Sequence, residues 1–125
     1  MPLWLERALL LAGLASIVAI VILSLIPGEV IHRGHGDGFD KHFIAYFICA
    51  GLLSLGQSGL PRWLRTVAVL VLLASTLEVL QFTTETRTPR WIDYFGGVLG
   101  TGTGVLAGAL TRGVLDRLAA LRYTR

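Results

Sequence analysis

Four long apolar segments, separated by short polar stretches, set the pattern of residues along the chain. This pattern predicts helices over about residues 6–26, 40–56, 62–82 and 91–111. Segments of roughly 17–25 apolar residues suit helices that cross the hydrocarbon core of a bilayer. Pro27 and Gly28 end the first segment, and the turn over residues 56–61 ends the second. The sequence therefore predicts an all-α integral membrane protein with four transmembrane helices.

Residues 112–125 continue the last segment with a different pattern. The apolar residues fall on one side of a predicted helix, and the arginines fall mostly on the other; the apolar ones are Val114, Leu115, Leu118 and Leu121. This pattern predicts a short amphipathic C-terminal extension that lies at the membrane surface. The whole chain, residues 1–125, then forms a single membrane domain.

Glycines recur at every fourth residue of the predicted helix over residues 91–111. Gly96, Gly100, Gly104 and Gly108 lie on one helical face. In water each would weaken a helix by roughly 1 kcal/mol, whereas in lipid they let a neighbouring helix approach closely. A glycine-rich soluble loop is the alternative, and the apolar flanking segments favour the helix. The pattern leaves open whether the neighbouring helix belongs to this chain or to another.

Composition supports the membrane interpretation. The chain is 54% hydrophobic and 15% charged, with a mean hydropathy of +0.69. Soluble domains usually carry about 25% charged residues. The net charge of +3 comes without a long basic run, so nucleic acid is not an expected partner. The single Cys49 excludes an internal disulfide and, within an apolar run, indicates a packing role.

The first apolar run could also be taken for a secretory signal peptide. From Ala8 to Ile26 it contains 19 residues without a charge. The apolar part of a signal peptide usually has about 7–15 residues and ends at a pair of small residues. Because this run is longer and has no clear cleavage site, we expect a retained helix.

The basic residues predict how the chain is oriented. With four spans, the N-terminus, the turn over residues 56–61 and the C-terminal tail share one side. That side holds seven basic residues, which are Arg7, Arg62, Arg65, Arg112, Arg117, Arg122 and Arg125. The other side holds four, which are Arg33, Lys41, Arg87 and Arg90. Because cytoplasmic loops are richer in Lys and Arg, both termini are predicted to be cytoplasmic.

The same topology brings polar residues from three distant segments to the outer membrane face. The second helix starts there, the third ends there and the fourth starts there. The expected binding residues are Asp40, Lys41, His42, Tyr46, Glu78, Gln81, Arg87, Arg90 and Asp93. Glu78 lies about one turn inside the membrane boundary, where an unpaired carboxylate costs several kcal/mol. We therefore expect a polar pocket that opens to the outside.

The residue types in this set suit acid–base and anion-binding chemistry. Glu78, His42 and Asp93 are candidates for an acid or base, and arginines suit phosphate or carboxylate groups. The alternative is that these groups only pair with one another and hold four helices together. Tyr46 and Trp91 have a further alternative, as aromatic residues that anchor helices at the membrane interface.

Metal binding has little support in the sequence. His32 and His35 lie in a glycine-rich loop without a third ligand at a fixed spacing. We expect no metal and no cofactor.

The polar residues also carry a family resemblance. Asp40-Lys41-His42-Phe43-x-x-Tyr46 resembles the opening motif of the VanZ-like membrane proteins, a family named after a protein linked to teicoplanin resistance. Glu78-x-x-Gln81-Phe82, Arg87, Asp93 and the glycines from Gly100 onward are similar to the second motif of that family. The family often has Asn four residues after the aspartate, where this chain has Gly97. The resemblance implies a small multi-helix protein of the bacterial cytoplasmic membrane, with a role in the cell envelope and glycopeptide susceptibility.

Three functions follow as hypotheses. In the first, the pocket binds an anionic envelope component, a lipid-linked phosphate or a cell-wall precursor headgroup, through Lys41, Arg87 and Arg90. In the second, the protein is an enzyme that acts on a lipid-linked envelope substrate. In the third, it is a structural subunit whose glycine face recruits a membrane partner or a second copy. Membrane lipids are expected partners in each.

Overall fold

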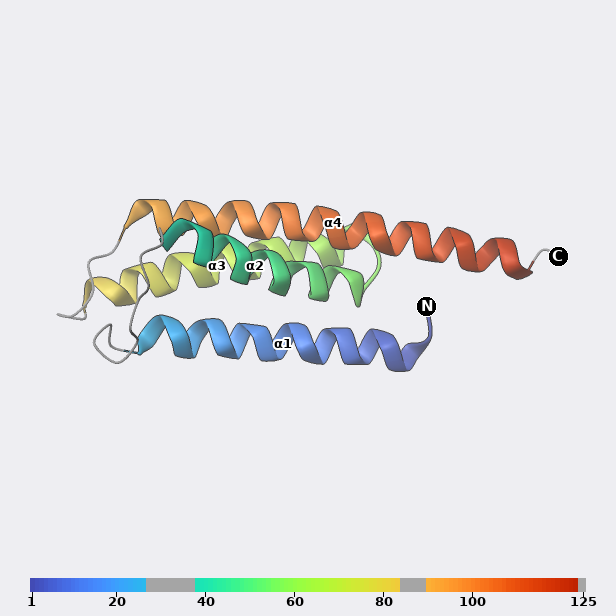
Figure 1. The fold of residues 1–125 in the computed structure, drawn as a ribbon, viewed down its shortest axis with the longest axis horizontal. Coiled ribbons are helices and arrows are strands. Elements are labelled where there is room, and N and C mark those ends of the chain that lie inside the picture. The colour runs from blue at the N-terminus through green and yellow to red at the C-terminus, as the bar shows by residue number, and fades with distance from the viewer. Residues whose placement is uncertain (27–37, 84–89, 124–125) are drawn as a thin grey trace.

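The computed structural model describes residues 1–26, 38–83 and 90–123, and these fold as helices without a strand. Figure 1 shows them lying side by side along one long axis, with both chain ends toward the same end of the bundle. The helices are α1 (Leu3–Leu25), α2 (Gly38–Leu55), α3 (Leu60–Phe82) and α4 (Trp91–Tyr123). All four predicted helices are present, and the first three begin two or three residues earlier than predicted.

The last helix extends further than the sequence predicted. Instead of ending at Thr111, α4 runs for 33 residues to Tyr123, so the predicted extension forms its last turns. At about 1.5 Å per residue it is roughly 50 Å long, more than a bilayer core needs. Gly113 is too weak a helix breaker to stop it, since glycine costs only about 1 kcal/mol within a helix. In Figure 1 its C-terminal part projects beyond the other helices.

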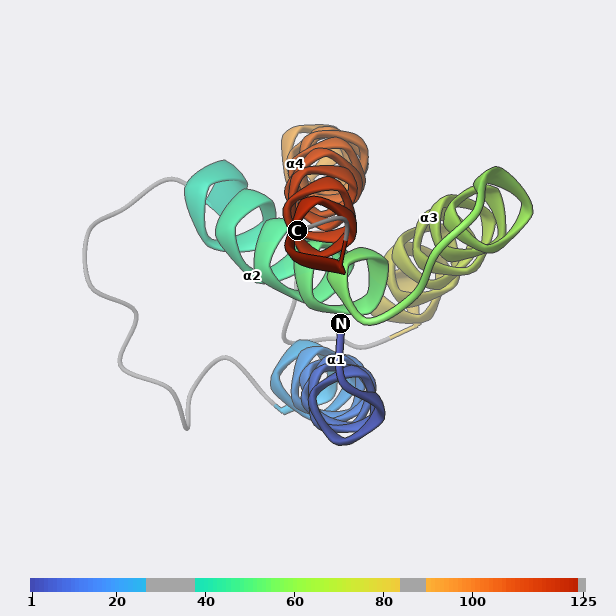
Figure 2. The same cartoon turned by 90° about the vertical axis from the view of Figure 1, so that its right-hand side faces the viewer.

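The helix α2 is central and contacts α1, α3 and α4. Figure 2, which looks along the bundle, shows it between α4 on one side and α1 on the other. Its side chains supply much of the buried core, which includes Tyr46, Cys49, Ala50 and Leu53. Cys49 is fully buried and its thiol donates a hydrogen bond to the Gly13 carbonyl oxygen of α1 at 3.5 Å.

The glycine face of α4 packs directly on the backbone of α2. A Cβ atom built on Gly96 would lie 2.7 Å from the Phe39 carbonyl oxygen, and one on Gly108 would lie 2.6 Å from that of Gly51. Between them, Gly100 and Gly104 meet the carbonyls of the residues one and two turns further along α2, which are Phe43 and Phe47. The glycine face is therefore used within the chain.

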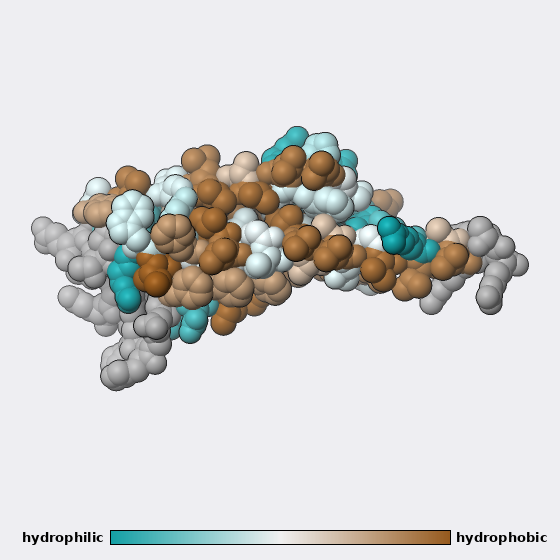
Figure 3. Space-filling model, turned by 90° about the horizontal axis from the view of Figure 1, so that it is seen from above, coloured by the Kyte–Doolittle hydropathy of each residue, from teal (hydrophilic) through white to brown (hydrophobic). Residues whose placement is uncertain are grey.

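Three of the helices have the length and hydropathy of membrane spans. These are α1, α3 and residues Trp91–Leu121 of α4, with window hydropathies of 2.8, 1.8 and 1.3. Within the described residues α2 is not among them, because Asp40, Lys41 and His42 in its first turns lower the mean hydropathy of its 18 residues. Large apolar side chains are exposed on the outside of every helix. Figure 3 shows such side chains in brown along most of one face, with hydrophilic side chains in a few separate patches. This surface suggests a membrane protein.

Candidate functional site

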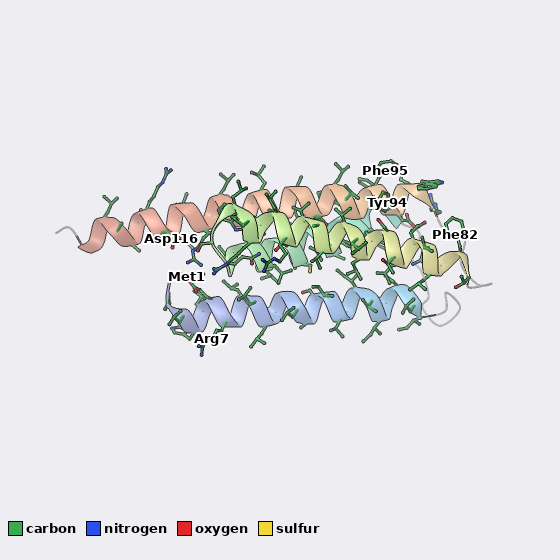
Figure 4. All side chains as sticks on the ribbon, turned by 180° about the vertical axis from the view of Figure 1, so that it is seen from behind. Met1, Arg7, Phe82, Tyr94, Phe95 and Asp116 are labelled. Carbon is green, nitrogen blue, oxygen red and sulfur yellow. The ribbon has the colours of Figure 1, made fainter. Side chains whose placement is uncertain are left out.

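A small polar cavity lies at the end of the bundle away from the chain ends. It has room for the centre of about one water molecule (about 10 Å³). Its lining comes from all four helices and consists of Ser24, His42, Tyr46, Ala74, Leu77, Glu78, Gln81, Asp93 and Tyr94. Figure 4 shows Tyr94 and Phe82 at this end, with Met1 and Asp116 at the opposite one.

Five of the predicted binding residues meet at this cavity: His42, Tyr46, Glu78, Gln81 and Asp93. Helical spacing explains why. His42 and Tyr46 are four residues apart on α2, Glu78 and Gln81 are three apart on α3, and each pair therefore shares a face. Asp93 stands in the first turn of α4, which starts at the same end of the bundle at which α3 ends. The cavity therefore lies at the end of the bundle that the topology predicted, and α1 lines it in addition to the three predicted helices.

Two carboxylates of this cavity are close enough to repel each other. Glu78 lies near Asp93 and His42, and it accepts a hydrogen bond from the backbone N–H of Arg90. Asp93 Oδ1 is buried and has no hydrogen-bond partner among the described residues. A buried acceptor without a donor costs about 1–3 kcal/mol. The cavity therefore contains two acidic side chains and one buried carboxylate oxygen that has no donor among the described residues.

Tyr46 is a buried residue of the cavity and not an interface anchor. Its side chain is only 1% exposed, which excludes the anchoring interpretation for this tyrosine. Trp91, by contrast, is 72% exposed near the end of the bundle, where an anchoring aromatic residue would lie. The Tyr46 ring packs on Gly97, where an added Cβ would lie 3.4 Å from two ring carbons. The ring thus occupies the space beside the position at which VanZ-like proteins often have Asn.

Gln81 links the cavity to the first helix. It is buried and its amide donates a hydrogen bond to the Ser24 carbonyl oxygen at 3.3 Å. Two polar residues that line the cavity were not predicted: Ser24, and Tyr94, which follows Asp93 in the sequence. A serine near the end of an otherwise apolar segment was the available signal for Ser24. For Tyr94, the only indication in the sequence was its position directly after Asp93.

The predicted cations flank the cavity and do not line it. Lys41 is exposed in the first turns of α2, directly before His42, and Asp40 is exposed beside it. Arg90 is exposed and approaches Glu78 through its backbone N–H. Arg87 lies outside the described residues. The expectation of a pocket with cations inside is thus replaced by acids inside and cations around them.

A second polar centre, at the opposite end, was not predicted. Arg112 is only 7% exposed and donates to Glu6 Oε1 at 2.6 Å and to Asp116 Oδ2 at 2.8 Å. It also donates to the Leu55 carbonyl oxygen of α2 at 3.4 Å. This Arg112 cluster joins α1, α2 and α4. The i, i+4 spacing of Arg112 and Asp116 was a usable signal, but Glu6 is 106 residues away from Arg112.

Metal-binding groups are a separate question. Within residues 1–26, 38–83 and 90–123, no three His, Cys, Asp or Glu side chains are grouped so that they could hold a metal ion. His32 and His35 lie outside these ranges.

No protein-family model, curated protein or solved structure matches this chain. The resemblance to VanZ-like proteins therefore stays a prediction from the motif residues.

Proposed function

We propose that the chain is a small multi-pass protein of the bacterial cytoplasmic membrane that binds the polar headgroup of an anionic envelope component at its cavity end. A lipid-linked phosphate or a cell-wall precursor is the expected class, as the resemblance to VanZ-like proteins also implies. One observation carries the proposal. Seven polar side chains from all four helices line one cavity at one end of a largely apolar bundle. Ionisable groups inside membrane proteins are costly and usually mark functional sites.

The charges around the cavity support headgroup binding. Lys41 and Arg90 are exposed at this end and provide cations for a phosphate group. Arg87, from the segment outside the described residues, is proposed to join them. The excess of basic residues near the chain ends predicts cytoplasmic termini, and with four crossings we propose that the cavity lies at the outer face. Both chain ends lie at the same end of the bundle, and this supports the proposal that α2 crosses the membrane as a fourth span.

An enzyme remains the second candidate because Glu78, Asp93 and His42 stand together. A pair of carboxylates beside an imidazole is suited to general acid–base chemistry. The two functions differ in turnover: incubation of the purified protein with a polyprenyl diphosphate should leave it unchanged if the protein only binds. The structural-subunit hypothesis loses its main support, since α2 already covers the glycine face of α4.

The headgroup proposal is tested with charge-removing variants in nanodiscs. The double variant Lys41→Met, Arg90→Met should bind a polyprenyl phosphate at least about tenfold more weakly, because two charge-assisted phosphate contacts are lost. The matched control is Arg7→Met, Arg62→Met, which removes two exposed cations from the opposite end. Native mass spectrometry measures the bound fraction. Equal binding by both double variants and the unmodified protein would refute the proposal.

A further inference from the structure

The cavity contains two acidic side chains and one buried carboxylate oxygen without a donor among the described residues, so a positively charged hydrogen-bond donor would suit it. Resting on the phosphate-binding part of the proposed function, we infer that the headgroup is a zwitterionic aminophosphate and not a purely anionic group. The primary ammonium enters the cavity between Glu78 and Asp93, and the phosphate lies against Lys41 and Arg90. The class of ligand is thus a lipid with a phosphoethanolamine-type headgroup.

The balance of donors and acceptors in the cavity supports an ammonium group. Asp93 Oδ1 is buried without a donor among the described residues, and Glu78 receives one from the backbone of Arg90. An ammonium group brings three N–H donors and no acceptor. It would satisfy Asp93 and would place a positive charge between two carboxylates that repel each other.

The size of the cavity selects among cationic headgroups. Its space admits the centre of about one water molecule (about 10 Å³), and a primary ammonium is of similar size. A trimethylammonium group carries the same charge but is much larger and has no N–H donor. The cavity should therefore accept phosphoethanolamine and reject phosphocholine, although the two headgroups have the same net charge.

The arrangement of charges matches the two ends of such a headgroup. The acids line the cavity, whereas Lys41 and Arg90 lie outside it on the exposed surface. A purely anionic headgroup would use the cations and gain nothing from Glu78 and Asp93. An aminophosphate uses both sets.

The test is a methylation series of one lipid in nanodiscs. Phosphatidylethanolamine, its N-methyl and N,N-dimethyl forms, and phosphatidylcholine keep the phosphate and the positive charge while donors are lost and size grows. The unmodified protein should retain phosphatidylethanolamine about tenfold over phosphatidylcholine, with a stepwise decline between them, as native mass spectrometry would record. An equal affinity for all four lipids would overturn the inference, and this arm needs no variant.

Variants then place the preference on the two acids. Asp93→Asn and Glu78→Gln should each reduce the preference for phosphatidylethanolamine over phosphatidylcholine to about threefold or less, because a cation site loses one of its carboxylates. Asp40→Asn is the matched control, since Asp40 is an exposed acid at the same end that does not line the cavity. An unchanged preference in both acid variants would also overturn the inference.

Failure of this inference can be told apart from failure of the proposed function. A preference for phosphatidylglycerol or a polyprenyl phosphate over phosphatidylethanolamine, lost in the Lys41 and Arg90 double variant, would leave anion binding intact and remove the ammonium. No headgroup preference at all, in the unmodified protein and in every variant, would remove both.

Discussion

Both ends of the bundle contain charged residues, but the charges attract each other at one end and repel each other at the other. At the Arg112 cluster, one buried cation meets two carboxylates and a backbone carbonyl, so donors and acceptors match. At the cavity, two carboxylates face each other and one of their oxygens has no partner among the described residues. A polar centre in which every donor has an acceptor holds helices together. A centre with an acceptor that has no donor can take the missing donor from a ligand. The relation between charges, and not their number, separates a structural cluster from a candidate site.

Removal of the Arg112 guanidinium should destabilise the end of the bundle at which the Arg112 cluster joins three helices. Arg112→Met leaves Glu6 and Asp116 without their shared partner, and we expect a loss of about 3 kcal/mol in the free energy of unfolding. Arg117→Met is the control, because Arg117 is exposed on the same helix and its loss should change stability by less than about 0.5 kcal/mol. Unfolding in mixed detergent micelles, followed by circular dichroism, measures both. Equal stability of the two variants would mean that the Arg112 cluster is not a structural lock.

Both ends depend on the contact between α2 and α4, and the glycines test it. Gly100→Ala would push a methyl group onto the Phe43 carbonyl and should cost about 2 kcal/mol. At Gly102, on the exposed side of the same helix, an added Cβ would meet no atom within 4 Å among the described residues. Gly102→Ala should therefore be neutral or stabilise by up to about 1 kcal/mol through helix propensity. The same unfolding measurement compares them, and matching losses would show that the glycine face is not a packing surface.

At the cavity end, removal of a charge should raise the free energy of unfolding instead of lowering it. Asp93→Asn takes away the repulsion with Glu78, so the free energy of unfolding should rise by about 0.5–1 kcal/mol while headgroup binding weakens. Asp116→Asn provides the comparison from the other end, where loss of a charged partner of Arg112 should lower stability by about 1 kcal/mol. If both variants lose stability, the cavity acids are structural and the contrast between the ends disappears.

Much of this organisation could be predicted from the sequence, and the exceptions have physical reasons. Apolar runs predicted the helices, and the alternation of direction in an antiparallel bundle brought His42, Glu78 and Asp93 to one end. The partner of the glycine face could not be predicted, because small residues permit close approach without choosing the helix that approaches.

The first helix shows the limit most clearly. Its residues are apolar on all sides, so no sequence pattern indicates which face turns inward. Ser24 at the cavity and Glu6 at the Arg112 cluster were missed for that reason. The rotation of α1 depends on close packing, such as that of Gly13 against Leu53, which only the folded structure reveals.

The smallest expected effect concerns Gly97, the position at which the predicted resemblance to VanZ-like proteins would call for Asn. In a helix a side chain at position 97 points back toward the residue four positions earlier, which is Asp93. Gly97→Asn would therefore offer an amide donor to the unpaired Asp93 oxygen, at the expense of moving the Tyr46 ring that packs on Gly97. The two changes oppose each other, so stability should shift by less than about 1 kcal/mol. The preference for phosphatidylethanolamine over phosphatidylcholine should fall about threefold, because an internal donor then competes with the ammonium group.

Gly97→Ala, which adds only a Cβ at an ordinary contact distance of 3.4 Å from the ring, is the control and should keep the preference. If Gly97→Asn also keeps it, the unpaired oxygen of Asp93 does not take part in headgroup recognition, and the contrast between the two ends would rest on the Glu78–Asp93 repulsion alone.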